Sequence, residues 1–194
     1  MKENLSQLLE SIYGKTIQIK SFETIGGGCI NETQALKLSN GERVFLKSNP
    51  SAPKNFFTAE ADGPRLLERS KNGPSVPRPL GISTESNPQF LLLEYIESSS
   101  PKVGFASRFG QALAEMHRET QEQYGLDYDN FIGKTVQKND LESDGLVFFR
   151  EHRIRFQQEF ARKTRGLPIS IDKRLDLFCE KLESLLDLKD EKPA

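Results

Sequence analysis

The chain has 194 residues, of which 36% are hydrophobic and 28% are charged, a composition typical of a folded globular protein rather than a disordered one. Lys and Arg total 27 against 28 for Asp and Glu, so the net charge of −1 gives no global field that attracts nucleic acid or an anionic membrane. No segment has the pattern of a signal peptide or a membrane span, and two cysteines are too few for a disulfide framework, so we expect a cytoplasmic protein.

The first fifty residues predict a short helix and then three antiparallel strands. The helix has an apolar face at helical spacing and ends at Gly14; this face consists of Leu5, Leu8, Leu9 and Ile12. Residues 16–25 alternate apolar and polar like a half-buried strand, and two strand-like runs flank Asn40-Gly41, a pair that suits a tight hairpin turn. Between the first two strands stand three glycines and a cysteine: Gly26, Gly27, Gly28 and Cys29.

The middle of the chain predicts one more helix and a buried strand. Residues 55–70 read as a helix that Gly63-Pro64 must kink or split, because proline lacks an N–H and clashes with the preceding turn. Residues 88–98 form a continuous apolar run of strand length. A turn-rich joint at residues 98–103 follows, so we predict two domains, a β-rich domain at 1–97 and a helical domain at 98–194.

The second domain predicts helices and no strand. A helix at 104–120 has an apolar face for the core, made of Phe105, Phe109, Ala112, Leu113 and Met116. A long loop spans residues 122–140, and a basic helix at 145–165 follows, whose arginines we expect to face solvent, the alternative being an acidic partner. The last helix, 170–188, carries Cys179 as a small core residue, and its expected buried face consists of Leu175, Phe178, Leu182 and Leu185.

The glycine run lies between two strands, and this position excludes the common phosphate loops. A dinucleotide fingerprint needs its glycines to lead into a helix. The two Gly-Lys-Thr triplets are not P-loops, because Leu9 and Tyr128 stand where the earlier glycine is required. A glycine turn within a hairpin resembles the protein-kinase-like fold, in which a third-strand lysine pairs the phosphates and a helical glutamate holds that lysine.

Lys47 and Glu60 stand where that fold requires them. Lys47 lies in the predicted third strand among apolar neighbours, and Glu60 lies in the helix that follows. The alternative is that Lys47 only extends its charge to solvent from a strand end. In the same fold the backbone of Glu94, Tyr95 and Ile96 would form the linker that hydrogen-bonds an adenine.

Seven segments together resemble the fructosamine (ketosamine) kinases, relatives of the aminoglycoside and choline phosphotransferases. In chain order they are GGGCINE, VFLKSNP, FFTAEADG, VPRPLG, FLLLEYIE, GQALAEMHR and YGLDYDNFIGKTVQKN. The resemblance implies an α+β, protein-kinase-like fold, with an antiparallel β-sheet lobe and pairing helix followed by the front, helical part of an incomplete second lobe. It implies ATP and Mg²⁺ as cofactors, a ketosamine substrate on a glycated amine or protein, and a role in deglycation repair.

The resemblance also assigns individual residues. It gives the turn of Gly26, Gly27, Gly28 and Cys29 to the nucleotide, Lys47 to the phosphates and Glu60 to the pairing helix. The segment Asn130–Gly133 matches a family motif whose role stays open between a packed loop and substrate contact. His117 matches a helical position, and we interpret it as a structural histidine.

One part of the family pattern is missing, because the chain has no H-G-D-L-W-type segment and no later aspartate motif. These supply the catalytic aspartate and the Mg²⁺ ligand, so we predict no catalytic and no metal-binding residue within the 194 residues. We therefore expect a truncated chain that is inactive as a kinase. The alternatives are a related aminoglycoside, choline or sugar kinase, and a non-catalytic nucleotide-binding or regulatory module.

Cys29 adds a redox hypothesis. Unpaired amides and Lys47 would favour its thiolate in the empty turn, so Cys29 is a candidate for oxidation or for an intermolecular disulfide that links two chains. The alternative is a small residue that fits the turn.

Overall fold

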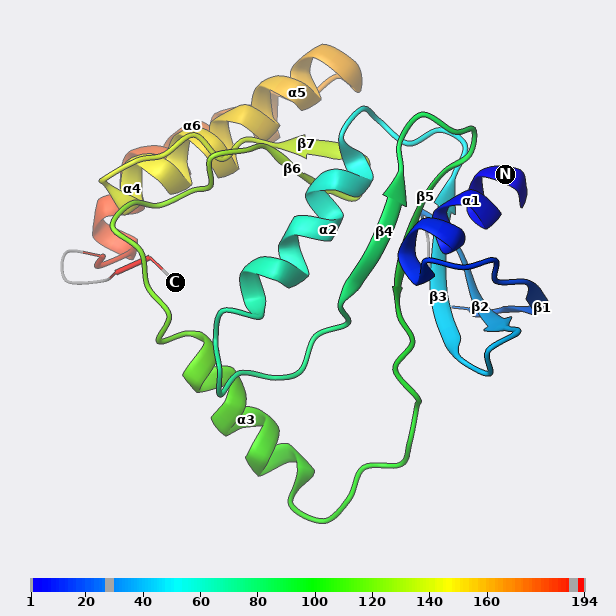
Figure 1. The fold of residues 1–194 in the computed structure, drawn as a ribbon. Coiled ribbons are helices and arrows are strands. Elements are labelled where there is room, and N and C mark those ends of the chain that lie inside the picture. Colours follow the sequence, from blue (N-terminus) through cyan, green and yellow to red (C-terminus); the bar gives the residue numbers. More distant parts are fainter. Residues whose placement is uncertain (1, 27–29, 189–191, 194) are drawn as a thin grey trace. The chain divides into compact units, whose positions relative to one another are not determined.

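The structure, a computed structural model, describes residues 2–26, 30–188 and 192–193. The chain forms two compact units, Met1–Met116 and His117–Ala194 (Figure 1). This division falls after Met116 and not at the joint near residue 98, so helix α3 belongs to the first unit. The assignment of 1–97 and 98–194 as parts of two lobes stays a prediction.

The first unit is a five-stranded antiparallel sheet with three helices. Its elements are α1 (Lys2–Tyr13), β1 (Ile19–Thr24), β2 (Glu32–Leu38), β3 (Arg43–Asn49), α2 (Phe56–Leu67), β4 (Pro79–Ser83), β5 (Gln89–Glu94) and α3 (Phe105–Met116). The strand order is β1-β2-β3-β5-β4. The hairpin between β2 and β3 turns at Asn40-Gly41, where Gly41 has a φ of 89°. The expected α+β class with an amino-terminal antiparallel sheet is confirmed.

Alternation along the strands gives the sheet two different faces. On one face, Leu36, Val44 and Leu46 are fully buried and pack with Leu5 and Leu9 of α1 into a single apolar cluster. The predicted apolar stripe of the first helix is therefore the stripe that covers the sheet. Burial of this stripe is the main source of its stability, since a 12-residue helix alone is marginal in water.

Helix α2 packs on the other face of the sheet, and Lys47 lies on this face. It contacts β4 and β5, and its buried side chains include Phe57 and Ala61 (Figure 1). The helix continues through Pro64 and is not split there, although Pro64 cannot donate a helical hydrogen bond. The Pro64 carbonyl accepts a hydrogen bond from the Glu68 N–H at 2.9 Å, so helical hydrogen bonding continues after the proline.

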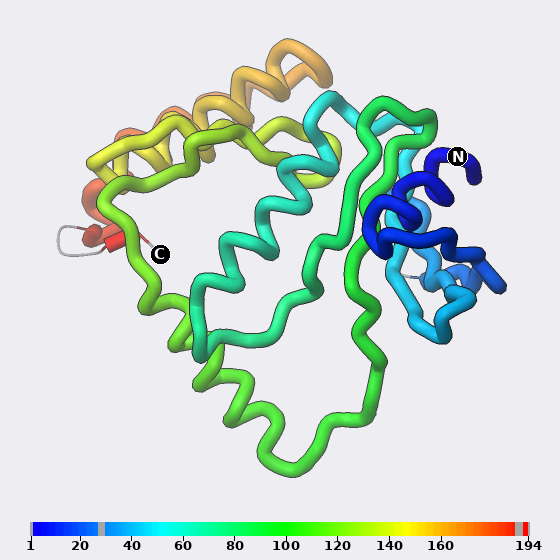
Figure 2. Tube along the Cα trace, viewed as in Figure 1, coloured from blue at the N-terminus to red at the C-terminus, as the bar shows by residue number. Residues whose placement is uncertain are grey.

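After β5 the chain runs without regular structure to Gly104 and then enters α3 (Figure 2). The helix was expected to bury an apolar face, but α3 has no buried residue. Phe105 and Phe109 stack on each other at 5.8 Å between ring centroids, and they are 50% and 47% exposed. The pattern correctly predicts an apolar face, but the structure leaves that face uncovered. His117, just beyond the helix, is exposed, and its interpretation as a structural histidine stays a prediction.

The second unit combines a small hairpin with helices. Its elements are β6 (Asn130–Ile132), β7 (Thr135–Gln137), α4 (Gly145–Phe148), the π-helical segment η1 (Phe149–Arg155), α5 (Phe156–Thr164) and α6 (Ile169–Leu185). The prediction of no strand in this half is wrong, because residues 130–137 pair as β6 and β7 around Gly133, whose φ is 65°. The basic helix does form, but a π-helical segment interrupts its α-helical geometry.

The arginines of the basic helix do not simply face solvent. Arg155 pairs with Asp176 of α6, and Arg162 pairs with Asp172 at 2.8 Å, so two of the charges tie α6 to the preceding helical run. On α6 itself Cys179 and Leu182 are buried, as predicted, whereas Phe178 and Leu185 are exposed. The buried stripe of α6 is thus narrower than its apolar pattern suggests. Over the described residues, no helix has the length and apolarity needed to span a bilayer.

Candidate functional site

Lys47 and Glu60 form an ion pair between β3 and α2. The Lys47 ammonium group donates to Oε1 of Glu60, and both side chains are about three-quarters buried, with exposures of 27% and 26%. Because side chains alternate along a strand, Lys47 lies on the sheet face that points away from α1. Glu60 of α2 directs its carboxylate toward this same face of the sheet. The structure therefore brings together the two charged residues that the sequence singled out.

The glycine turn is anchored at both ends. Of its residues the structure describes Gly26, and the predictions for Gly27, Gly28 and Cys29 lie outside the described residues. Before the turn, the Ile25 N–H donates to the Thr33 carbonyl at 3.0 Å, and the Thr33 hydroxyl donates back to the Ile25 carbonyl at 2.6 Å. This reciprocal pair fixes where the turn leaves the sheet.

Asn49 holds the other end of the turn. This residue is 3% exposed, and its amide donates to the Ile30 carbonyl at 3.3 Å and to Oδ1 of Asn31 at 3.0 Å. Asn31 in turn donates to Oε2 of Glu60 at 3.5 Å, so the turn and the ion pair belong to one network. Sequence reasoning missed Asn31 and Asn49, although both lie inside the quoted segments GGGCINE and VFLKSNP; polar residues beside a glycine turn were the available signal.

The predicted linker begins where the sheet ends. Glu94 is the last residue of β5, opposite Val44, and its N–H donates to the Arg78 carbonyl at 2.9 Å, so a base cannot use that group. Tyr95 and Ile96 follow, beyond the paired registers of β3 and β5. The backbone that remains for a base is therefore that of residues 95 and 96 together with the Glu94 carbonyl.

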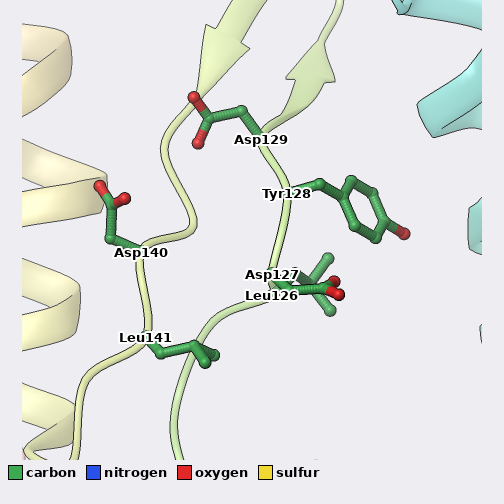
Figure 3. A pocket seen from close by; sticks show the side chains of 6 residues that line it. All are labelled: Leu126, Asp127, Tyr128, Asp129, Asp140 and Leu141. Carbon is green, nitrogen blue, oxygen red and sulfur yellow. The ribbon is translucent and has the colours of Figure 1, made fainter.

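An open pocket of about 390 Å³ lies in the second unit, lined by Leu126, Asp127, Tyr128, Asp129, Asp140 and Leu141. Figure 3 shows Asp127 and Tyr128 pointing to one side of the chain and Asp129 and Asp140 to the other. Asp129 already accepts from Lys138 at 2.6 Å. In the part of the chain that the structure describes, no group of three or more His, Cys, Asp or Glu side chains is placed to hold a metal ion.

A buried asparagine organises the loop around this pocket. Asn139 is 1% exposed, and its amide donates to the Tyr128 carbonyl at 3.1 Å and to Oδ1 of Asn130 at 3.0 Å. Arg153 donates to Oδ1 of Asn139 at 2.8 Å, and burial lowers the pKa of this arginine. Asn130 therefore belongs to a packed network, whereas Ile132 at the hairpin tip is 63% exposed.

The first unit offers the better chemistry for an anionic ligand. A lysine held by a carboxylate is fixed in place and keeps donors for phosphate oxygens. The residues on either side of the glycine run are held by part-buried hydrogen bonds, and glycine, which lacks a Cβ, is the residue type that lets a backbone approach a phosphate closely. These residues fit the phosphates of a nucleotide, and the acidic pocket does not.

Comparison with known proteins identifies the family of the chain. The family model described as "Fructosamine kinase" matches residues 1–194. A "Protein-ribulosamine 3-kinase, chloroplastic" of Oryza sativa subsp. indica is 34% identical over 163 residues, which cover 82% of this chain and 47% of that protein. A "Probable ketoamine kinase" of Pasteurella multocida is 31% identical over 198 residues, covering 100% of this chain and 66% of the relative.

Solved structures give the same result. The crystal structure of a "putative fructosamine-3-kinase" from Haemophilus somnus 129PT matches with a TM-score of 0.82 and 29% identity, over 100% of this chain and 63% of that one. The chain thus spans about half the length of the rice relative and about two-thirds of the bacterial ones. Because the family model matches from the first residue to the last, the chain belongs to the fructosamine kinase family.

Proposed function

We propose that this chain carries the nucleotide-binding part of an ATP-dependent kinase that phosphorylates the sugar hydroxyl of ketosamines on glycated amines or proteins. The names of the relatives support the ketosamine class. The observation that carries the ATP part is the ion pair of Lys47 with Glu60, joined through Asn31 to the anchored glycine turn. Phosphorylation that destabilises the sugar adduct would give the protein a role in deglycation repair.

Each residue group has a role in this proposal. The backbone of Gly26, Gly27 and Gly28 receives the phosphates, Lys47 pairs them, and Glu60 keeps Lys47 in place. The segment Glu94–Ile96 receives the base. Mg²⁺ bound with the nucleotide would neutralise phosphate charge, and among the described residues no cluster of three or more His, Cys, Asp or Glu side chains is placed to hold it.

We further propose that residues 1–194 bind ATP without transferring its phosphate. They contain no H-G-D-L-W-type segment to supply a catalytic aspartate. Loss of a general base alone slows a reaction by roughly 10²–10⁴-fold. The same observation favours, as a second candidate, a non-catalytic nucleotide-binding module.

Thermal unfolding with and without ATP tests the binding part of the proposal. Ligand at 100 times its Kd stabilises the folded state by about 2.7 kcal/mol, so the melting temperature of the native chain should rise. The rise should be lost in Lys47→Ala and reduced in Glu60→Gln. It should persist in Lys37→Ala, an exposed lysine on the same sheet face. No shift at millimolar ATP contradicts both the kinase and the module proposals.

Phosphate transfer separates the two candidates. Residues 1–194 can be joined to the remaining carboxy-terminal part of the Pasteurella multocida relative and incubated with labelled ATP. Transfer to a fructose–lysine ketosamine, and not to choline or an aminoglycoside, is expected from an interrupted ketosamine kinase. ATP binding without transfer to any of the three substrates would favour the non-catalytic module.

A further inference from the structure

Strand pairing sorts the residues of the Lys47 face into rows across the sheet. Thr33, Lys47 and Leu91 form the first row, because Thr33 pairs with Lys47 and Lys47 with Leu91. The second row consists of Glu23, Ala35, Phe45 and Leu93. In the third row Lys37 pairs with Arg43. Tyr95 comes one residue after Glu94, which pairs with Val44, so Tyr95 lies next to Arg43 at the end of this row. Rows two residues apart lie about 7 Å apart along a strand.

Arg43 of β3 contacts two other segments, β1 and the chain that follows β5. Its guanidinium donates to Glu23 of β1 at 3.0 Å and to Glu97 beyond β5 at 2.9 Å. Its Cζ atom lies 3.9 Å from the centre of the Tyr95 ring. Desolvation lowers the pKa of Arg43, but the Glu97 hydrogen bond and the charges around it outweigh this effect and raise it overall.

These contacts join the two segments that the proposed function gives to the nucleotide. Glu23 lies two residues before Ile25, from which the chain enters the glycine turn. Tyr95 and Glu97 lie in and beside the segment assigned to the base. Arg43 itself lies on the sheet face that carries Lys47, two rows away.

The ion pairs of Arg43 are expected to position their partners rather than to stabilise the whole fold. The two glutamates are 71% and 70% exposed, and ion pairs with exposed partners contribute little to unfolding free energy. A planar guanidinium that lies on a ring and forks to two carboxylates nevertheless fixes the direction of all three groups. A lysine at this position would keep the charge and lose the fork.

We propose that Arg43 is a positioning residue for nucleotide binding, whose guanidinium, anchored on Glu23, holds Tyr95 and Glu97 so that segment 94–96 is ready to receive the base. The inference rests on the proposed function, because it assumes that a nucleotide base lies against this segment. It assigns Arg43 to the base and leaves the phosphates to Lys47 and the glycine turn.

The test compares ATP with inorganic tripolyphosphate, which has the phosphates but no base. Kd values for both ligands are measured by calorimetry on the native chain and on Arg43→Ala, Arg43→Lys, Tyr95→Leu and the double variant Arg43→Ala/Tyr95→Leu. Lys37→Ala, in the same row, is the matched control for loss of positive charge. Melting temperatures are recorded for every variant, and Glu97→Gln replaces Arg43→Ala if the latter does not fold.

Arg43→Ala and Tyr95→Leu should each weaken ATP binding about fivefold, while tripolyphosphate binding stays within about twofold of native. The double variant should be no weaker than either single one, because both changes break one unit. Arg43→Lys should resemble Arg43→Ala, and Lys37→Ala should leave both affinities unchanged. Equal loss of both ligands in Arg43→Ala, or additive losses in the double variant, would overturn the inference. A native chain that binds neither ligand would instead refute the proposed function.

Discussion

A single buried residue, Asn49, holds the residues that follow the glycine turn. Its side chain donates to Ile30 and Asn31, and its Oδ1 accepts from the Ser51 N–H at 2.8 Å. Asn49→Ala removes these three hydrogen bonds of a buried side chain, and each such bond contributes about 0.5–1.5 kcal/mol. Urea denaturation should therefore show a decrease of about 2 kcal/mol in the unfolding free energy.

The control for this variant is Asn72→Ala, an exposed asparagine in a turn of the same unit. Its unfolding free energy should change by less than about 0.5 kcal/mol. Equal losses in the two variants would show that the Asn49 network does not stabilise the turn.

Alanine substitutions at two glycines of the second unit distinguish the cost of steric crowding from the cost of backbone strain. Gly125 has a φ of 109°, and a Cβ there would lie 2.9 Å from the Asp140 carbonyl oxygen and closer still to that of Asn139. Gly166 has a φ of 69° with open space around it. Gly166→Ala should cost about 1–2 kcal/mol for the left-handed backbone, and Gly125→Ala about 1–3 kcal/mol more for overpacking. Denaturant unfolding checks both, and equal costs would contradict the tight loop.

At the scale of elements, the junction of α5 with α6 predicts a dependence of stability on pH. Hydrogen bonds from Arg162 and then from Gln158 hold the pKa of Asp172 below its ordinary value of 3.8. The unfolded chain therefore takes up this proton first, so the stabilisation is complete above pH 3.8 and disappears as the pH falls through the lower folded value.

Asp172→Asn should remove this dependence. At pH 7 its melting temperature should fall by about 2 °C or less, because solvent reaches both partners, whose side chains are 43% and 26% exposed, and the difference from native should vanish in acid. Glu183→Gln, an exposed carboxylate on the same helix, is the control and should leave the acid dependence unchanged. A difference from native that stays constant down to pH 2 would contradict the assignment.

The sequence predicted the elements whose signals are local and strong. The Asn40-Gly41 turn, the apolar stripe of α1 and the positions of Lys47 and Glu60 all follow from spacing and turn chemistry. The strands β6 and β7 have three residues each, too few for alternation to be recognised. Asn49 and Arg43 were missed for a different reason, because their importance lies in partners distant in sequence. An apolar pattern, as on α3, shows which face avoids water but not what covers it.

At the scale of the whole molecule, the chain spans only part of the length of its relatives, and α3 has an uncovered apolar face. Contiguous exposed apolar residues bind hydrophobic dyes and promote association. Phe105→Ser/Phe109→Ser should therefore reduce the fluorescence of a bound dye by about half. Leu67→Ser, which removes another exposed apolar residue, should have little effect. Equal decreases would show that the face of α3 is not the dye site.

The central claim is that a nucleotide binds at the Lys47 face and not in the acidic pocket of the second unit. Titration of ATP into isotope-labelled protein, followed by the chemical shifts of backbone amides, tests this location directly. The amides of Gly26, Lys47 and residues 95–96 should shift with a common Kd, while those of residues 126–141 stay in place. Shifts confined to residues 126–141, or no shifts at millimolar ATP, would contradict the account.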